Sequence, residues 1–193
     1  MPVPVHTSVV VEAILARTLS LAGDGQAALR AGLDDLPAPI YVTDAEGLIT
    51  YFNPACVPFA GREPRAGQDR WCVTWKLYSL DGAFLPHDRC PMAEAIRTRQ
   101  PMRGASALAE RPDGTRLRFL PYPTPIFARD GAFLGAANLL LDARRELRTE
   151  ALTDLAGRCR AVAATSENRQ TAAMLSRRAD DYEARAREPG DEA

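Results

Sequence analysis

Two short runs of alternating apolar and polar residues, at 40–44 and 48–52, form the clearest pattern in this chain. A period of two is typical of a β-strand with one face on a core. The runs flank an Ala-Glu-Gly turn at 45–47, so together they predict a β-hairpin. Asn53 and Pro54 follow, and these residue types suit the N-cap and the first position of a helix. The stretch therefore predicts strand, turn, strand and helix in direct succession.

Turns of an acidic residue followed by glycine divide the rest of the central region, at 81–82, 113–114 and 130–131. Pro91 opens a further helix, because proline lacks a donor that the first helical position would leave unused. The apolar face of this helix carries Met92, Ala95 and Ile96. Three candidate strands come after it, over 102–110, 115–127 and 132–142. The order β-β-α-α-β-β-β predicts an α+β domain with an antiparallel sheet and helices on one face.

The second of these three strands contains an unusual proline pattern. Pro121, Pro123 and Pro125 occupy alternate positions, so their missing N–H groups all point toward the same neighbouring strand. Pairing on that side must fail. We therefore expect a bulge or a break around residues 121–125.

The N-terminal segment, residues 1–32, is predicted to be helical. Residues 8–22 are apolar on almost every side of a helix, and a second helical piece follows before Pro37 and Pro39. A helix that is apolar all round must be buried on more than one side, which favours a homodimer. The apolar positions behind this expectation are Val9, Val10, Val11, Ala13, Ile14, Leu15, Leu19 and Leu21.

The C-terminal segment, residues 146–193, shows helical spacing of apolar residues in two stretches. Thr165 and Ser166 separate the stretches and are good N-cap residues. The spacing predicts two amphipathic helices that fold back as a helical hairpin. Its apolar positions are Leu152, Leu155, Cys159 and Val162 in the first helix, and Ala172, Leu175, Ala179, Tyr182 and Ala186 in the second.

Composition narrows the class of protein. With 193 residues, 46% of them hydrophobic, the chain is long enough for one small domain with appendages. The formal charge is -1, and the arginines are scattered, so the charge does not favour nucleic acid or an anionic membrane as a partner. The four cysteines form no C-x-x-C pair, which favours buried thiols over disulfide bonds. Free thiols in turn favour a cytoplasmic location.

Three stretches together resemble a PAS (Per-Arnt-Sim) sensor domain of the bacterial type: LPAPIYVTDAEGLITYFNPA, LYSLDGAFLPHDRCPMAEAI and ERPDGTRLRFLPYPTPIFARDGAFLGAANLLLDAR. The resemblance covers residues 33–145. It implies a five-stranded antiparallel sheet and a cavity between the inner face of the sheet and the central helices. It also implies that flanking helices carry dimerisation and output.

Candidate cofactor ligands are sparse. His87, Cys90 and Cys72 would supply three metal ligands, but no fourth is evident. Cys90-Pro91 resembles a haem-responsive pair, yet the central helix contains no histidine of the kind that haem-binding PAS domains use, and the flavin-linked cysteine motif of light-oxygen-voltage sensors is missing. Haem through His87 or Cys90 stays open as a minor alternative. We predict no metal and no bound cofactor, and a colourless protein.

Five residues are candidates for lining the implied cavity. Trp71, Trp75 and Tyr78 lie at near-helical spacing and would stack on a planar ligand, while Met92 and Ile96 lie on the central helix. The alternative is plain core packing, since aromatic residues are expected in a small core.

Catalytic patterns are missing from the sequence. It contains no glycine-rich phosphate loop after a strand and no G-x-S-x-G, so we do not expect an enzyme. His6 and His87 are the only histidines, which leaves the C-terminal helices without a phosphoacceptor for histidine-kinase activity. The sequence predicts a PAS-like signalling module that binds a small ligand or a protein partner. A ligand-free interaction adaptor is the alternative.

Overall fold

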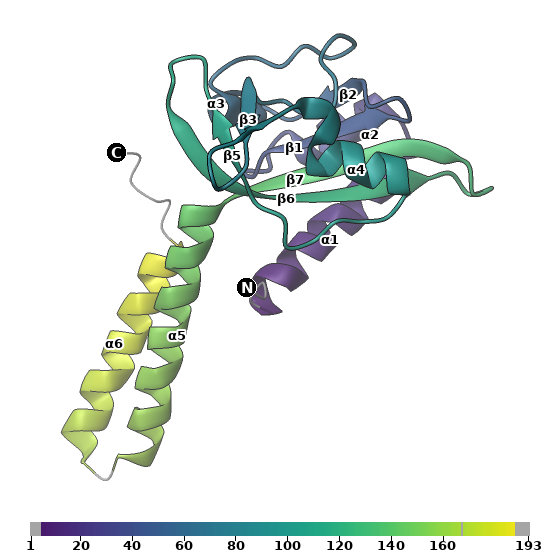
Figure 1. Ribbon diagram of the computed structural model, residues 1–193. Coiled ribbons are helices and arrows are strands. Elements are labelled where there is room, and N and C mark those ends of the chain that lie inside the picture. The colour runs from purple at the N-terminus through teal and green to yellow at the C-terminus, as the bar shows by residue number, and fades with distance from the viewer. Residues whose placement is uncertain (1–4, 167, 188–193) are drawn as a thin grey trace. The chain divides into compact units, whose positions relative to one another are not determined.

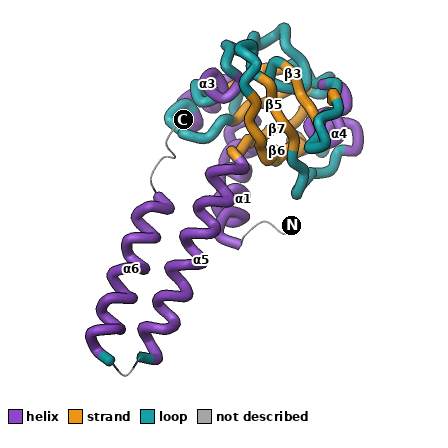
Figure 2. Tube along the Cα trace, turned by 60° about the vertical axis from the view of Figure 1, so that its left-hand side comes forward, coloured by secondary structure: helices purple, strands orange, loops and turns teal. Residues whose placement is uncertain are grey.

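The computed structural model describes residues 5–166 and 168–187, apart from the side chains at 5–9, 145 and 150. The chain divides into two compact units, one up to Asp142 and one from Ala143 onward. The first unit contains α1 (Val5–Ala22), α2 (Gln26–Leu33), β1 (Ile40–Asp44), β2 (Ile49–Phe52), α3 (Cys56–Ala60), β3 (Lys76–Tyr78), β4 (Phe84–Leu85), the 3-10 helix η1 (His87–Arg89), α4 (Pro91–Thr98), β5 (Ala107–Glu110), β6 (Arg116–Phe127) and β7 (Phe133–Asp142). Figures 1 and 2 show these elements.

A single antiparallel sheet organises the first unit, with strand order β2-β1-β7-β6-β5-β3-β4. This architecture confirms the predicted PAS-like α+β fold. The predicted strand count is wrong, because the sheet has seven strands and not five. The two additional strands, β3 and β4, are three and two residues long and pair with each other across the turn at 81–82. Strands this short give no detectable alternation in sequence.

Helices cover both faces of the sheet (Figure 1), so the predicted placement of helices on one face is incomplete: α3 and α4 pack on one face, and α1 and α2 pack on the other. Tyr41 of β1 points into a cluster that includes Phe59 of α3 and Met92 of α4. Its neighbours Ile40 and Val42 point into a second cluster, formed with α1 and α2. Successive strand side chains face opposite sides of a sheet, so β1 is buried on both faces.

The three prolines of β6 do not break the strand, so the predicted bulge at 121–125 is wrong. Pairing with β7 runs in register from Phe119 to Ile126, and the shift occurs after Ile126. Pairing with β5 ends at Phe119, before the prolines begin. The Pro123 carbonyl accepts a hydrogen bond from the Met102 N–H on that side. The three prolines therefore lack their N–H groups on the side of β6 where β5 has already ended, so no strand pairing is lost.

Asn53 is not the helix cap that its position predicts. Helix α3 begins at Cys56 with Ala55 as the N-cap residue, which makes no side-chain capping hydrogen bond. The Asn53 side chain is fully buried and turns back toward the end of α2 and the start of β1. Pro54 and Ala55 form the turn before α3.

One face of α1 packs on the sheet of its own chain. Val11, Leu15 and Thr18 are buried on this face, whereas Val10 is exposed. The side chain of Val9 lies outside the described part of the chain. Burial of α1 on a second side by another copy of the chain stays a prediction.

The second unit is the predicted helical hairpin, with α5 (Ala143–Thr165) packed along α6 (Arg169–Arg187), as Figure 2 shows. Leu152, Ala156 and Ala179 are buried between the helices, while Leu155 and Val162 are exposed. The predicted apolar face of the first helix is therefore partly wrong. The cap of α6 also differs from the expected Thr165 and Ser166: Asn168 Oδ1 accepts hydrogen bonds from the N–H groups of Gln170 and Thr171.

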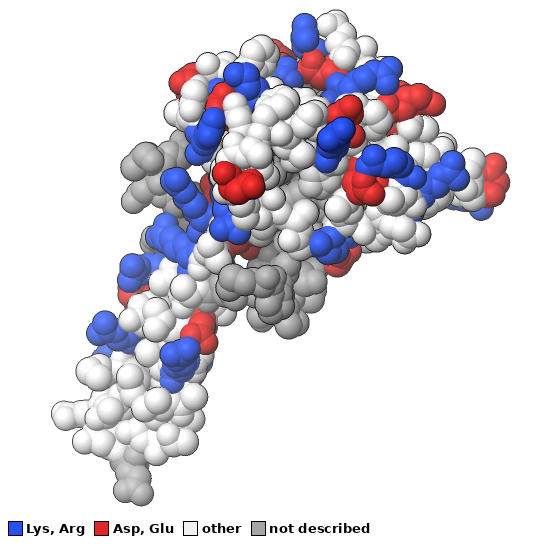
Figure 3. Space-filling view, viewed as in Figure 1, with Lys and Arg blue, Asp and Glu red and all other residues white. Residues whose placement is uncertain are grey.

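Charged side chains of both signs are interspersed on the face shown in Figure 3, as the scattered arginines predict. Among the described residues, no helix is both long and apolar enough to cross a membrane.

Candidate functional site

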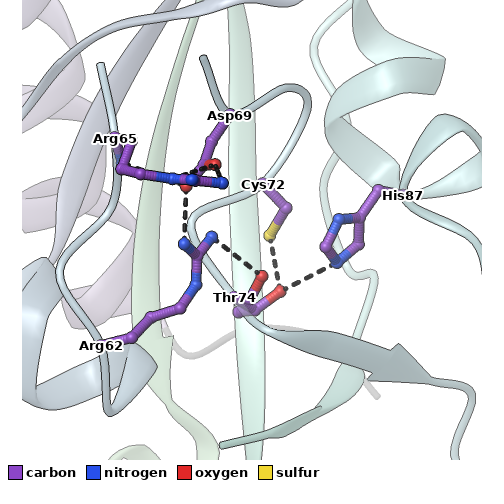
Figure 4. A network of polar contacts seen from close by, with 6 residues as sticks. All are labelled: Arg62, Arg65, Asp69, Cys72, Thr74 and His87. Carbon is purple, nitrogen blue, oxygen red and sulfur yellow. Dashed lines mark hydrogen bonds and ion pairs between the residues drawn. The ribbon is translucent and has the colours of Figure 1, made fainter. Parts of the chain in front are cut away.

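A hollow of about 190 Å³ lies between the loop that joins α3 to β3 and the 3-10 helix η1. Its lining is mostly polar and charged. The lining residues are Arg62, Arg65, Asp69, Arg70, Cys72, Thr74, Trp75 and His87. Figure 4 shows six of them converging from the loop and from η1. We treat this hollow as the candidate site and call it the arginine hollow.

The loop is anchored by Trp71, which has the left-handed backbone angle φ 67°. This conformation is costly for a bulky residue, so the surroundings must hold it in place. The Trp71 N–H donates to the Gly47 carbonyl at 2.8 Å, and the Trp71 carbonyl accepts from the Tyr41 hydroxyl at 2.9 Å. Gly47 is required beneath the ring, since a Cβ there would lie 2.2 Å from it. The β1–β2 turn and β1 together fix the loop.

Asp69 ties two arginines of the arginine hollow together. One carboxylate oxygen lies 2.7 Å from Arg62 Nη1 and accepts the Arg65 N–H at 3.0 Å, and the other accepts from Arg65 Nη2 at 3.1 Å. Burial alone raises the pKa of Asp69, but the Arg65 N–H and the Arg62 guanidinium outweigh it and lower the pKa below 3.8. Asp69 is therefore ionised and both of its oxygens are occupied.

The far side of the arginine hollow holds neutral polar groups. The Thr74 hydroxyl donates to Cys72 Sγ at 3.1 Å and lies 3.5 Å from His87 Nε2. Burial raises the pKa of the Cys72 thiol. Burial, followed by the charge of Arg62, lowers the pKa of His87 below 6.5. At neutral pH the thiol and the imidazole are both uncharged, so the lining of the hollow carries one anionic side chain, Asp69, and three arginines.

A second hollow, of about 220 Å³, lies on the other side of the sheet between α2 and the strands. It includes Leu29, Val42, Ile126 and Leu134 and no lysine, arginine or histidine. Its one acidic residue, Asp44, accepts the backbone N–H groups of Glu46 and Leu48 within its own turn. This second hollow offers no comparable set of charged groups for a ligand.

The five predicted cavity residues are spread over three environments. Trp75 lines the arginine hollow and is 51% exposed, while Trp71 packs on the core. Tyr78 is half-buried on β3, and its ring lies under the Arg116 guanidinium at 4.0 Å. Met92 and Ile96 are buried in the core beneath α4 and do not line either hollow. A ligand cavity lined by these five stays a prediction.

The sequence-based prediction of the site did not include its charged residues. Arg62, Arg65, Asp69 and Arg70 fall within nine residues, and this density of charge in a loop was the available signal. Their convergence depends on the folded path of the loop around Trp71.

Cys90 acts as a helix cap. Its sulfur accepts the Ala93 N–H at 3.5 Å, and burial raises the pKa of its thiol to about 12. Among the described residues, no three His, Cys, Asp or Glu side chains come together as metal ligands. The expectations of no cofactor and a colourless protein stay predictions.

No protein-family model and no curated protein matches the chain. Among solved structures, the PAS domain of the fruit-fly ELK potassium channel is 13% identical, with 60% of this chain and 94% of that chain covered and a TM-score of 0.48. The Rhodobacter sphaeroides LOV protein is 15% identical, with 81% and 90% covered and a TM-score of 0.45. The PAS domain of an HTR-like protein from Haloarcula marismortui is 16% identical, with 66% and 98% covered and a TM-score of 0.40.

Proposed function

We propose that this protein is a non-enzymatic sensory and signal-transduction module whose PAS-like domain responds to a small ligand in the arginine hollow. The carrying observation is the convergence of Arg62, Arg65, Arg70 and Trp75 on one open hollow. The loop that carries these side chains is attached through Trp71 to the central strands. A ligand that repositions the loop thereby acts on the sheet.

Two hydrogen bonds that connect the loop to β7 support transmission toward the C-terminal helices. The Trp71 carbonyl accepts from the Tyr41 hydroxyl, which in turn accepts from Asn138 Nδ2 at 3.0 Å. Asn138 lies on β7, and β7 ends at Asp142, directly before α5 begins at Ala143. We therefore propose that a shift of Trp71 changes the position of β7, the strand that leads into α5. We propose that the flanking helices carry the output, as a homodimer or through a signalling partner protein.

Thermal-shift screening followed by hydrogen–deuterium exchange tests this proposal. The full chain is screened against small anionic, neutral and cationic compounds, and exchange in residues 143–187 is then compared with and without a stabilising compound. We expect at least one compound to raise the melting temperature and to change exchange in α5. A compound that binds without changing exchange outside the first unit would argue against transmission. The absence of any stabilising compound would remove the sensory proposal.

A ligand-free adaptor is the second candidate, and core packing favours it. Phe59, Phe119, Met92, Ile96 and Leu140 pack together between the sheet and the helices α3 and α4. These side chains occupy part of the space that the PAS resemblance assigns to a ligand. An adaptor predicts that no small compound stabilises the chain, whereas a protein partner captured through α5 and α6 does.

A further inference from the structure

We infer that the arginine hollow binds a small aromatic carboxylate, with its carboxylate on the arginines and its ring on Trp75. This inference rests on the proposed function in using the same hollow, and it adds the chemical class of the ligand. It is carried by three properties of the hollow, namely its charge, its exposed aromatic ring and its size.

The charge of the lining is positive. The lining holds three arginines, Arg62, Arg65 and Arg70, and a single carboxylate, that of Asp69, whose oxygens are already occupied by Arg62 and Arg65. The nearby Glu46 contributes its backbone carbonyl, which accepts from Arg70 Nη1 at 2.9 Å. With His87 uncharged, the lining carries a net charge of +2, from three arginines less one aspartate. An incoming anion lowers this excess, and arginine is the residue best suited to a carboxylate because its planar fork donates two parallel hydrogen bonds.

The donors of this hollow are incompletely used within the protein. Arg62 Nε is buried, and no described residue accepts a hydrogen bond from it. The Nη2 of the same residue reaches the Thr74 carbonyl at 3.5 Å, a long contact. Arg62 is therefore ion-paired with Asp69 through Nη1 but keeps one donor, Nε, unused within the protein.

Trp75 supplies a recognition surface for a flat ring. Its side chain is half exposed at the edge of the hollow, although tryptophan is usually highly buried. An aromatic ring packs favourably on an indole in an offset or edge-to-face arrangement. The combination of exposed indole and arginines favours a ligand that is planar at one end and anionic at the other.

The size of the hollow limits the ligand. Its volume of about 190 Å³ is below the roughly 300 Å³ at which pockets for drug-sized ligands begin. It corresponds to about six water molecules at roughly 30 Å³ each. One ring with one carboxylate fits within this space, whereas most of a dinucleotide or of a fused-ring cofactor would extend outside it into solvent.

Isothermal titration calorimetry on the full chain tests the assignment with four probes. Benzoate is the expected ligand, benzamide removes the charge, cyclohexanecarboxylate removes the flat ring, and inorganic phosphate is an anion without a ring. We expect benzoate to bind most tightly, and each of the other three about fivefold or more weakly, because each lacks one of the two interactions. Equal binding of phosphate and benzoate, or of benzamide and benzoate, would overturn the assignment.

Matched variants connect the binding to this hollow. Arg70→Gln is expected to weaken benzoate binding about tenfold, and Trp75→Ala about fivefold, by loss of the charged donor and of the stacking surface. Arg129→Gln and Phe84→Ala serve as controls, because both residues are exposed and neither lines the hollow. Benzoate binding that is equally affected by the controls, or unaffected by Arg70→Gln and Trp75→Ala, would place the ligand elsewhere.

The outcomes also separate this inference from the proposed function. Failure of benzoate to bind, together with stabilisation by a neutral or cationic compound that changes exchange in α5, would overturn the ligand class and leave the sensory role standing. Binding of benzoate at the hollow without any change of exchange in α5 would support the ligand class and argue against the sensory role.

Discussion

At the scale of single residues, Asn53 joins more of the first unit than any helix cap would. Its Oδ1 accepts the Ile40 N–H at 3.0 Å. Its Nδ2 donates to the carbonyls of Leu33, Leu36 and Ala38 at 3.3, 3.1 and 3.0 Å. These partners span the end of α2 and the entry to β1, so one buried amide holds the N-terminal helices to the sheet.

Asn53→Ala should therefore lower the free energy of unfolding by about 2–4 kcal/mol, because it leaves a buried donor and several acceptors without a partner. Urea denaturation followed by circular dichroism measures the change. Asn168→Ala is a matched control that removes an exposed asparagine from the start of α6, with an expected cost of about 1 kcal/mol. Equal losses in the two variants would contradict the role assigned to Asn53.

His87 should make stability depend on pH in a defined direction. Burial and the charge of Arg62 lower its pKa in the folded state below 6.5, while Asp69 and Asp88 oppose them. Between the folded pKa and 6.5 the unfolded chain binds more protons, so stability is present above about pH 6.5 and decreases as the pH falls below it. Thermal melts of the parent and of His87→Gln from about pH 8 to about pH 5 should show a smaller loss in the variant. An identical loss in both would remove His87 as its source.

At the scale of elements, α4 is an amphipathic helix that closes one core cluster. Cys90 caps it, and Met92, Ala95 and Ile96 are buried on its inner face, as the sequence predicts. Arg99 ends the helix in the left-handed conformation. The helix therefore depends on burial of this face more than on its length of eight residues.

Ile96→Asp should disrupt this packing, because it places a carboxylate among the apolar side chains of the core cluster. We expect a loss of several kcal/mol or failure to fold, measured by thermal denaturation. Ile96→Val keeps an apolar side chain at the same position and should cost about 0.5–1.5 kcal/mol. If Ile96→Asp melted as Ile96→Val does, the side chain would have to be solvent-accessible.

Elements with long, regular patterns could be predicted from the sequence, and those fixed by distant contacts could not. The hairpin at 40–52, the helix after Pro91 and the last two strands each carry their own periodicity or turn residues. Strands β3 and β4 are too short to carry a pattern and exist because β5 pairs with β3. The arginine hollow depends on Trp71 packing over Gly47, a contact between residues 24 positions apart that no local pattern encodes.

At the scale of the whole molecule, each unit leaves apolar side chains uncovered within one chain. Leu147, Leu155 and Val162 are exposed on α5, with Leu155 40% accessible. At 100° per residue they fall within a sector of about 80°, so they form one stripe along the helix. On α1, Val10 is exposed beside the face that packs on the sheet. We propose these two surfaces as the candidate interfaces for a second copy of the chain.

Light scattering on the full chain decides between these surfaces. Removal of residues 1–32 would not test α1 as a dimer interface. Helices α1 and α2 cover Tyr122, Ile126 and Leu139 on the sheet, and exposing these apolar residues would itself promote aggregation. Charged substitutions on the intact chain avoid this problem. If α5 forms the dimer, the double substitution Leu155→Glu and Val162→Glu should give a monomer, since four carboxylates would then be buried at a two-fold interface.

Val10→Glu makes the corresponding test of α1, and Met174→Glu is the control, because Met174 is an exposed apolar residue on the other helix of the hairpin. We expect the α5 double variant to dissociate the dimer and Met174→Glu to leave it intact. Dissociation by Val10→Glu alone would place the interface on α1, as the apolar character of that helix predicts. A parent chain that is monomeric at tens of micromolar would exclude both surfaces as dimer interfaces and leave them to a different partner protein.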